Sequence, residues 1–241
     1  MNIAIDFGNS VAKAAVFEGD KLMDYYHALS PVELIKLVND HPQASVITAT
    51  VTADATHIIN LIENKSRLTK LVYKTPTPII NAYLTPETLG MDRLAAVVGA
   101  NYLYPKTDCL VIDAGTCITY DFVDENAVYH GGSISLGLKM RFKALHHFTS
   151  RLPLLEYKED KYKLIGKDTE EAMVSGVVGG IENELIGIIS SYKMRYPQLK
   201  VIICGGDGPF FESIIKQRIF AVPELVLIGL NRILIYNAEK A

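Results

Sequence analysis

Two stretches of the chain, Ile3-Ala-Ile-Asp6-Phe-Gly8-Asn9-Ser10 and Leu110-Val-Ile-Asp113-Ala-Gly115-Thr116-Cys117, repeat one pattern. In each, an apolar run ends at an Asp, a Gly stands two residues later, and a small polar side chain follows the Gly. The apolar run predicts a buried strand, and the Gly predicts a tight turn at its end. Both stretches continue into a second apolar run, so each predicts a β-hairpin.

The two copies lie about half a chain length apart, too far for a solenoid repeat, and predict two similar α/β halves. We expect these halves at 1–106 and 107–241. One copy alone is equally compatible with a strand that ends in an Asx turn. Two copies favour two phosphate-binding turns, where a carboxylate holds Mg²⁺ directly or through water and the metal neutralises a triphosphate.

Composition narrows the class of protein. The chain has 241 residues, of which 49% are hydrophobic and 21% charged, as in soluble globular proteins. A net charge of −3 gives no basic footprint for nucleic acid. The stretch Ala172–Ile189 is apolar but carries Glu182 and Glu184, which argues against a membrane span. Asp6 interrupts any signal segment, and the three cysteines lack metal-finger spacing, so we expect a cytoplasmic protein.

Periodicity predicts alternating strands and helices. Strands are expected at 2–6, 11–18, 21–27, 45–49, 70–73 and 199–204, besides the hairpin that opens at 110. Helices are expected over Pro31–Val38, Thr56–Asn64, Glu87–Tyr104, 138–148 and Asp168–Tyr196. Asp168 is a candidate N-cap of the last of these helices, with Glu171 at N3 and Pro197 beyond its end.

A third glycine-rich turn, Gly205-Gly206-Asp207-Gly208, follows the strand at 199–204. Alone, it fits a nucleotide-binding turn or an ordinary tight βα turn. The chain contains neither the P-loop pattern nor a G-x-G-x-x-G fingerprint after a strand, which argues against those nucleotide folds. The order of the three turns resembles that of the actin, sugar-kinase and Hsp70 ATPase superfamily.

Between the two repeated stretches lies Gly90-Met91-Asp92-Arg93, at the start of a predicted helix. An Asp at this place can accept a hydroxyl proton, and an Arg can hold a substrate carboxylate or the charge of a moving phosphoryl group. The alternative is a structural role, in which Asp92 and Arg93 are exposed in the first turn of the helix and satisfy the helix dipole.

Further motifs narrow the resemblance. They are Tyr83, Pro86-Glu-Thr-Leu-Gly-Met-Asp-Arg93, Gly131-Gly132, Arg151-Leu-Pro153 and Ile165-Gly-Lys-Asp-Thr169. In this order, with the three turns, they make the chain similar to type III pantothenate kinases along its whole length. The resemblance implies two ribonuclease H-like halves of the actin-like ATPase fold. Each half would hold a mixed five-stranded sheet flanked by helices, with the site in the cleft between them.

The family resemblance also implies the activity: ATP-dependent phosphorylation of pantothenate to 4'-phosphopantothenate, the first step of coenzyme A synthesis. Asp92 would be the general base. The ATP site would comprise Asp6, Phe7, Gly8, Asn9, Ser10, Val11, Ala12, Lys13, Thr116, Gly205 and Gly206. The pantothenate site would comprise Tyr83, Gly90, Met91, Asp92, Arg93 and Thr169.

For cofactors, the resemblance implies Mg²⁺ near Asp6, directly or through water, and a monovalent cation, K⁺ or NH₄⁺, at Asp113. It also implies a homodimer, in which Thr169 can come from the neighbouring subunit. Leu136, Ser10 and Cys117 depart from the residues common in the family and bear on loop geometry and nucleotide affinity.

Two alternatives remain open. One is another catalyst of the same superfamily, either a different small-molecule kinase or a phosphatase. The other is a catalytically silent nucleotide-binding or regulatory protein. The Gly90–Arg93 loop and Tyr83 argue against the first, and the retained Asp6, Asp92 and Asp113 argue against the second.

Overall fold

The computed structural model describes residues 1–8, 11–50, 67–157, 162–215 and 217–240. The chain forms two compact units. The first comprises Met1–Lys106, Val123–Gly131 and Glu224–Ala241, and the second comprises Thr107–Phe122 and Gly132–Pro223. The division into halves 1–106 and 107–241 stays a prediction, and two segments of its second half are packed with the first unit.

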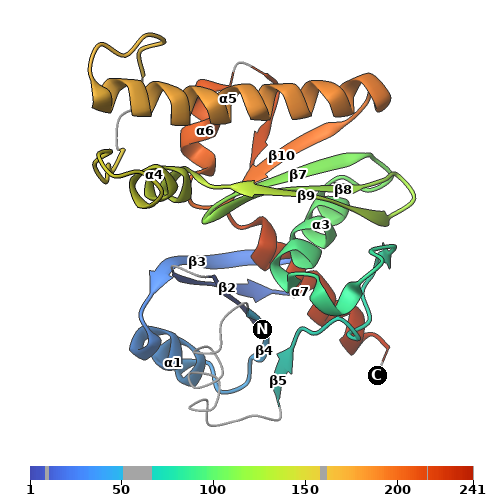
Figure 1. Cartoon of the computed structure of the whole chain (residues 1–241). Helices are drawn as coiled ribbons and strands as arrows, with labels where there is room; N and C mark the ends of the chain where they lie inside the picture. The colour runs from blue at the N-terminus through green and yellow to red at the C-terminus, as the bar shows by residue number, and fades with distance from the viewer. Residues whose placement is uncertain (9–10, 51–66, 158–161, 216, 241) are drawn as a thin grey trace. The chain divides into compact units, whose positions relative to one another are not determined.

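The first unit is built on a five-stranded mixed sheet in the order β3-β2-β1-β4-β5. Its strands are β1 (Asn2–Phe7), β2 (Ala12–Glu18), β3 (Lys21–Leu29), β4 (Ser45–Thr50) and β5 (Leu68–Lys70). The helices are α1 (Pro31–Asp40), the 3-10 helix η2 (Pro86–Thr88), α3 (Met91–Leu103) and α7 (Leu225–Ala238), labelled in Figure 1 where there is room. The central strand β1 is antiparallel to β2 and parallel to β4.

The second sheet has the order β11-β10-β7-β8-β9-β6. Its strands are β6 (Ile80–Asn81), β7 (Cys109–Ala114), β8 (Cys117–Val123), β9 (Val128–Leu136), β10 (Lys200–Cys204) and β11 (Phe220–Ala221). The helices of the second unit are α4 (Leu138–His147), α5 (Thr169–Arg195) and α6 (Gly208–Ile214). The prediction of five strands in each sheet is right for the first and wrong for the second, because β6 adds a sixth strand beside β9.

The first five strands of the second sheet repeat the order of the first sheet. In that comparison β7, β8, β9, β10 and β11 take the places of β1, β2, β3, β4 and β5. The central strands β1 and β7 carry the repeated sequence, and each has a parallel neighbour, β4 or β10. Asp6 and Asp113 therefore occupy equivalent positions near the carboxyl ends of two equivalent strands, as the repeat predicts.

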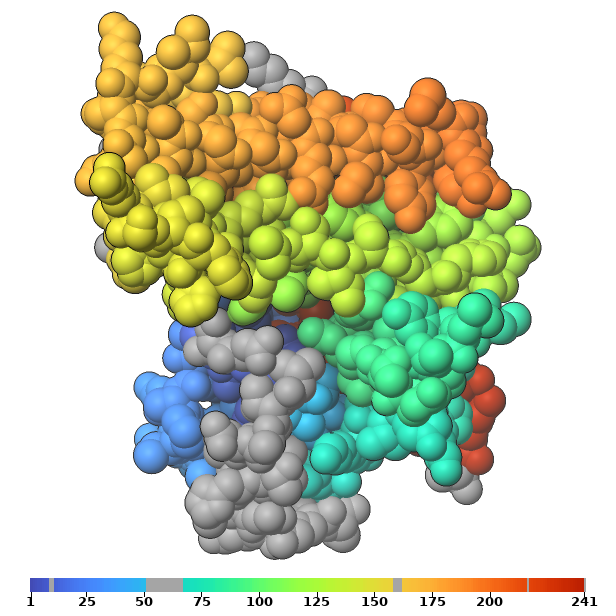
Figure 2. All heavy atoms as spheres, in the orientation of Figure 1, coloured from blue at the N-terminus to red at the C-terminus, as the bar shows by residue number. Residues whose placement is uncertain are grey.

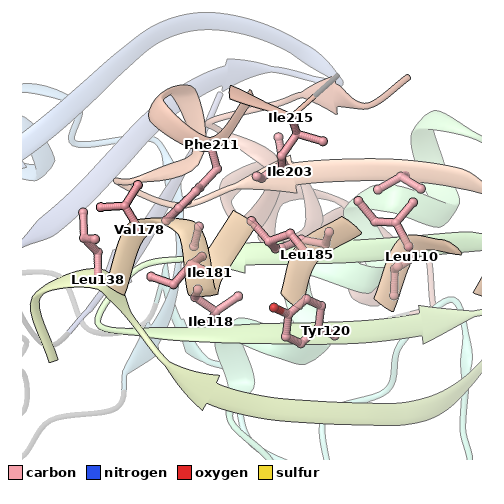
Figure 3. Packing of buried hydrophobic residues seen from close by; sticks show 14 of the residues in the cluster. Leu110, Ile118, Tyr120, Leu138, Val178, Ile181, Leu185, Ile203, Phe211 and Ile215 are labelled. Carbon is pink, nitrogen blue, oxygen red and sulfur yellow. The ribbon is translucent and has the colours of Figure 1, made fainter. Parts of the chain in front are cut away.

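The core of the second unit lies between its sheet and the long helix α5. Figure 3 shows Val178, Ile181 and Leu185 of α5 packed in one cluster with Ile118 and Tyr120 of β8. In the described part of the chain, α5 is the one helix long and apolar enough, by length and composition, to span a bilayer. The helix is apolar because its buried residues form part of this hydrophobic core.

The predicted elements differ from the observed ones at two places, and a third prediction is not tested. The helix expected over Glu87–Tyr104 is two elements, η2 and α3, because Leu89 and Gly90 are extended between them. The strand expected at 70–73 is β5, which ends at Lys70. The helix expected over Thr56–Asn64 lies outside the described residues.

Candidate active site

Asp6 lies near the carboxyl end of β1, directly opposite Lys13 of β2. Residues opposite one another in an antiparallel pair have their side chains on the same face of the sheet. The carboxylate and the ammonium group therefore share a face. Ile3 and Ile5 pack in the core on the other face of the first unit's sheet.

Gly8, which follows β1, lies close to Val11, which precedes β2. A Cβ placed on Gly8 would lie 3.3 Å from the carbonyl oxygen of Val11, so a side chain there would press on the turn. Phe7 is buried in the core of the first unit. Asn9 and Ser10, both predicted to contact ATP, lie outside the described residues.

Asp92 lies in the first turn of α3, two residues after the N-cap residue Gly90. Its Oδ1 atom accepts a hydrogen bond of 2.9 Å from the backbone amide of Arg93. A Cβ on Gly90 would overlap this oxygen, so glycine leaves room for the carboxylate in its observed orientation. The first turn of a helix has amides without intrahelical partners and a partial positive charge, and Asp92 lies beside both.

Arg93 and Tyr83 form a second part of this site. The guanidinium carbon of Arg93 lies over the Tyr83 ring, 5.7 Å from its centroid. Arg93 is buried, with 7% of its surface exposed. A guanidinium group held against an aromatic face keeps its edge donors for carboxylates or phosphates. The first unit thus brings three predicted pantothenate-site residues together, Tyr83, Arg93 and Asp92.

Asp113 lies near the end of β7, in register with Cys204 of β10. Gly205 follows β10, and a Cβ on it would overlap both Asp113 Oδ1 and the carbonyl oxygen of Ala114. A carboxylate oxygen and a carbonyl oxygen therefore converge on the backbone of Gly205. The second unit brings Asp113 and the predicted ATP-site residue Gly205 together.

Thr116 lies in the turn between β7 and β8 and is exposed. Its carbonyl oxygen accepts a hydrogen bond of 3.2 Å from the amide of Gly137. A Cβ on Gly137 would overlap the carbonyl oxygens of both Gly115 and Thr116. Gly137 thus holds the second predicted phosphate loop by a backbone contact that only glycine allows, although Leu136 precedes it where proline is common in the family.

Asp207 is a half-buried residue of this region that the sequence-based assignment left out of the site. Its amide donates a hydrogen bond of 2.8 Å to the carbonyl oxygen of Ala114. Burial raises the pKa of its carboxyl group above the usual range, and the Lys139 ammonium offsets part of that rise. Its place in the Gly205–Gly208 turn was a sequence signal that could have identified it.

Thr169 is exposed at the first position of α5, where Asp168 caps the helix by accepting from the amide of Glu171 at 2.8 Å. The residue is one of those that line an open apolar cavity of about 790 Å³ between α4 and α5. Figure 2 shows the surfaces of α4, in yellow, and α5, in orange, beside each other.

The oxygen donors present fit the cations that the family resemblance implies. In the described residues no group of three or more His, Cys, Asp or Glu side chains could hold a metal. A Mg²⁺ ion that is bound mainly by phosphates and water needs no such group. For a monovalent cation, Asp113 Oδ1 and the carbonyl oxygen of Ala114 are hard oxygen donors near one point.

Comparison with solved structures defines the class of fold. A protein from Campylobacter jejuni, described as a putative Baf family transcriptional activator, matches with a TM-score of 0.66 at 22% identity. The match covers 98% of this chain and 99% of that one. A putative N-acetylmannosamine kinase from Listeria monocytogenes matches with a TM-score of 0.54 at 12% identity, over 98% and 99% of the two chains. The chain therefore shares its α/β fold with these two proteins.

Sequence comparison gives the family. The model of the type III pantothenate kinase family matches residues 2–191. A type III pantothenate kinase from Bacteroides fragilis is 48% identical over 241 residues, 98% of each chain. Another, from Phocaeicola vulgatus, is 46% identical over 242 residues, 98% of this chain and 99% of the relative. The chain belongs to the type III pantothenate kinase family.

Proposed function

We propose that the protein transfers the γ-phosphoryl group of ATP to the primary hydroxyl group of pantothenate and so catalyses the first step of coenzyme A synthesis. The observation that carries the proposal is the first turn of α3. It holds a half-buried carboxylate, Asp92, next to a buried guanidinium group, Arg93, in a chain that belongs to this family. A small anionic alcohol needs these two groups, one for its hydroxyl proton and one for its carboxylate.

Asp92 accepts the proton of the attacking hydroxyl group. Arg93 and Tyr83 bind the carboxylate end of pantothenate, and Gly90 and Met91 shape the loop around it. Thr169 adds a hydrogen bond from its exposed position, within one subunit or from the partner of a homodimer. Phosphoryl transfer depends mainly on positioning and charge neutralisation, so the chain needs no covalent intermediate.

The turn from Asp6 to Lys13, the hydroxyl of Thr116, and the backbone of Gly205 and Gly206 bind ATP. Asp6 holds Mg²⁺ directly or through water, and the bound metal neutralises the phosphates. Asp113, with the carbonyl oxygen of Ala114, holds K⁺ or NH₄⁺. We also propose a homodimer in the cytoplasm that acts without nucleic acid or membrane.

A coupled assay of ADP release tests this function. Purified protein is incubated with ATP, Mg²⁺ and a panel of small alcohols, with and without K⁺. We expect ADP release that depends on pantothenate and increases with K⁺, and an Asp113→Ala variant in which the K⁺ dependence is lost. Release with another alcohol but not with pantothenate would favour a different small-molecule kinase. No release with any alcohol would favour a non-catalytic protein, the class suggested by the description of the Campylobacter jejuni relative.

A further inference from the structure

The ring of Tyr83 lies beside two residues of β9, Tyr129 and Gly131. Tyr129 is fully buried and lies parallel to Tyr83, with ring centroids 6.2 Å apart and an interplanar angle of 6°. A Cβ on Gly131 would lie 3.0 Å from Cδ2 and 3.2 Å from Cε2 of Tyr83. A side chain at position 131 would therefore press on the edge of the Tyr83 ring.

The backbone of this region fixes the same arrangement. β6 pairs with β9 in parallel, with Asn81 opposite Tyr129. The amide of Ala82 donates to the carbonyl oxygen of Tyr129 at 3.0 Å, and the Asn81 side chain accepts from the amide of Tyr83 at 3.0 Å. Tyr83 thus follows a short strand that is paired with β9, and these hydrogen bonds anchor the backbone of Tyr83 beside β9.

Asp124 closes the turn that precedes β9. Its Oδ1 atom accepts from the amides of Asn126 and Val128, each at 2.9 Å, and its Oδ2 atom lies 2.8 Å from His130 Nε2. A turn with these contacts holds Tyr129 and Gly131, which flank His130, in a fixed register. The Arg93 guanidinium group lies over the Tyr83 ring.

We propose that Tyr129 and Gly131 are positioning residues for the carboxylate end of the substrate, acting through Tyr83 and Arg93. This inference rests on the proposed function and extends it to residues outside the predicted site. Tyr129 gives the Tyr83 ring a flat support, and Gly131 leaves the space in which that ring lies. The ring in turn sets the plane of the guanidinium group that pairs with a carboxylate. Misplacement of this group weakens substrate binding more than it slows phosphoryl transfer.

The test is a Gly131→Ala variant with a matched Gly19→Ala control. Gly131 and Gly19 both have positive φ, 94° and 57°, so alanine strains the backbone at both. A Cβ on Gly19 meets nothing within 4 Å. We expect Gly131→Ala to raise the KM for pantothenate by about tenfold, with little change in kcat or in the KM for ATP, and Gly19→Ala to change none of them. We expect a Tyr129→Leu variant to show the same rise in the KM for pantothenate as Gly131→Ala.

Near-ultraviolet circular dichroism gives a second readout, because the chain has 13 Tyr and no Trp. We expect an altered tyrosine band in Gly131→Ala and an unaltered one in Gly19→Ala. Equal KM values for pantothenate in the two variants, or a loss confined to kcat, would overturn the inference.

Failure of the proposed function gives a separate result, which is no pantothenate-dependent turnover in the wild type. In that case, the rise in melting temperature on adding pantothenate tests whether Tyr129 and Gly131 position the substrate site. A stabilisation of the wild type that Gly131→Ala loses supports the inference. Equal stabilisation of both proteins, or none in either, contradicts it.

Discussion

Asp92 owes its place to two neighbours in the sequence. Gly90 leaves space for its carboxylate, and the amide of Arg93 donates a hydrogen bond to it. These contacts are local, so the four-residue pattern Gly90–Arg93 could indicate a candidate site, whose role stays a prediction. The support of Tyr83 by Tyr129 and Gly131 could not be predicted in this way. It joins residues more than forty positions apart, and no local pattern records such a contact.

The Asp92→Asn substitution tests the role of the carboxylate. Asparagine keeps the size of the side chain but cannot accept the hydroxyl proton as a base. We expect kcat to fall by about 10²–10⁴-fold, with ATP binding retained as measured by thermal shift. Turnover near that of the wild type would remove Asp92 as the base.

At the scale of elements, α3 and α7 of the first unit cross at two glycines. A Cβ on Gly229 would overlap the carbonyl oxygen of Ala95, and a Cβ on Gly99 would overlap that of Leu225. The backbones of the two helices are therefore in direct contact. The sequence did not reveal α7, because its run from Leu225 to Ile235 is apolar on nearly every side and shows little helical periodicity.

The Gly229→Ala substitution tests this crossing. The added methyl group forces α3 and α7 apart, and we expect unfolding in urea to show a loss of about 1–3 kcal/mol. Gly187 of α5 is the control, since a Cβ there meets nothing within 4 Å. Gly187→Ala should stabilise the protein by up to about 1 kcal/mol. Equal effects of the two substitutions would contradict the close contact.

Three elements of the second unit are joined by one carboxylate on α5. Glu184 accepts from the hydroxyl of Tyr120 on β8 at 2.7 Å and from the guanidinium group of Arg141 on α4. Burial acts to raise the pKa of Glu184, but the hydrogen bonds from Arg141 and Tyr120 outweigh it and lower the pKa below 4.5. The ionised carboxylate therefore stabilises the folded state.

The Glu184→Gln substitution tests this connection through its pH dependence. Because the folded pKa is lowered, the stabilisation is fully present above the unfolded value near 4.5 and is lost as pH falls through the folded value. We expect Glu184→Gln to be less stable than the wild type by about 1–2 kcal/mol at pH 7. The difference should shrink in acid. A difference that is constant from pH 7 to pH 3 would rule out the ionised carboxylate as its cause.

At the scale of the whole molecule, the repeat in the sequence corresponds to a repeat in the strand order of the two sheets. The pattern at residues 3–10 and 110–117 predicted two equivalent central strands, and β1 and β7 are such strands. The sequence could predict this because a buried strand and its turn are both local features. It could not predict β6 or the packing of α7 in the first unit, because pairing between distant segments depends on the complete fold.

The central claim is that this chain phosphorylates pantothenate. The most direct measurement is phosphorus NMR of the products formed from ATP, Mg²⁺, K⁺ and pantothenate, with the Asp92→Asn variant in parallel. We expect the wild type to form 4'-phosphopantothenate and ADP in equal amounts and Asp92→Asn to form almost none. A wild-type sample that yields no phosphorylated pantothenate, or an Asp92→Asn sample that yields as much as the wild type, would contradict the account.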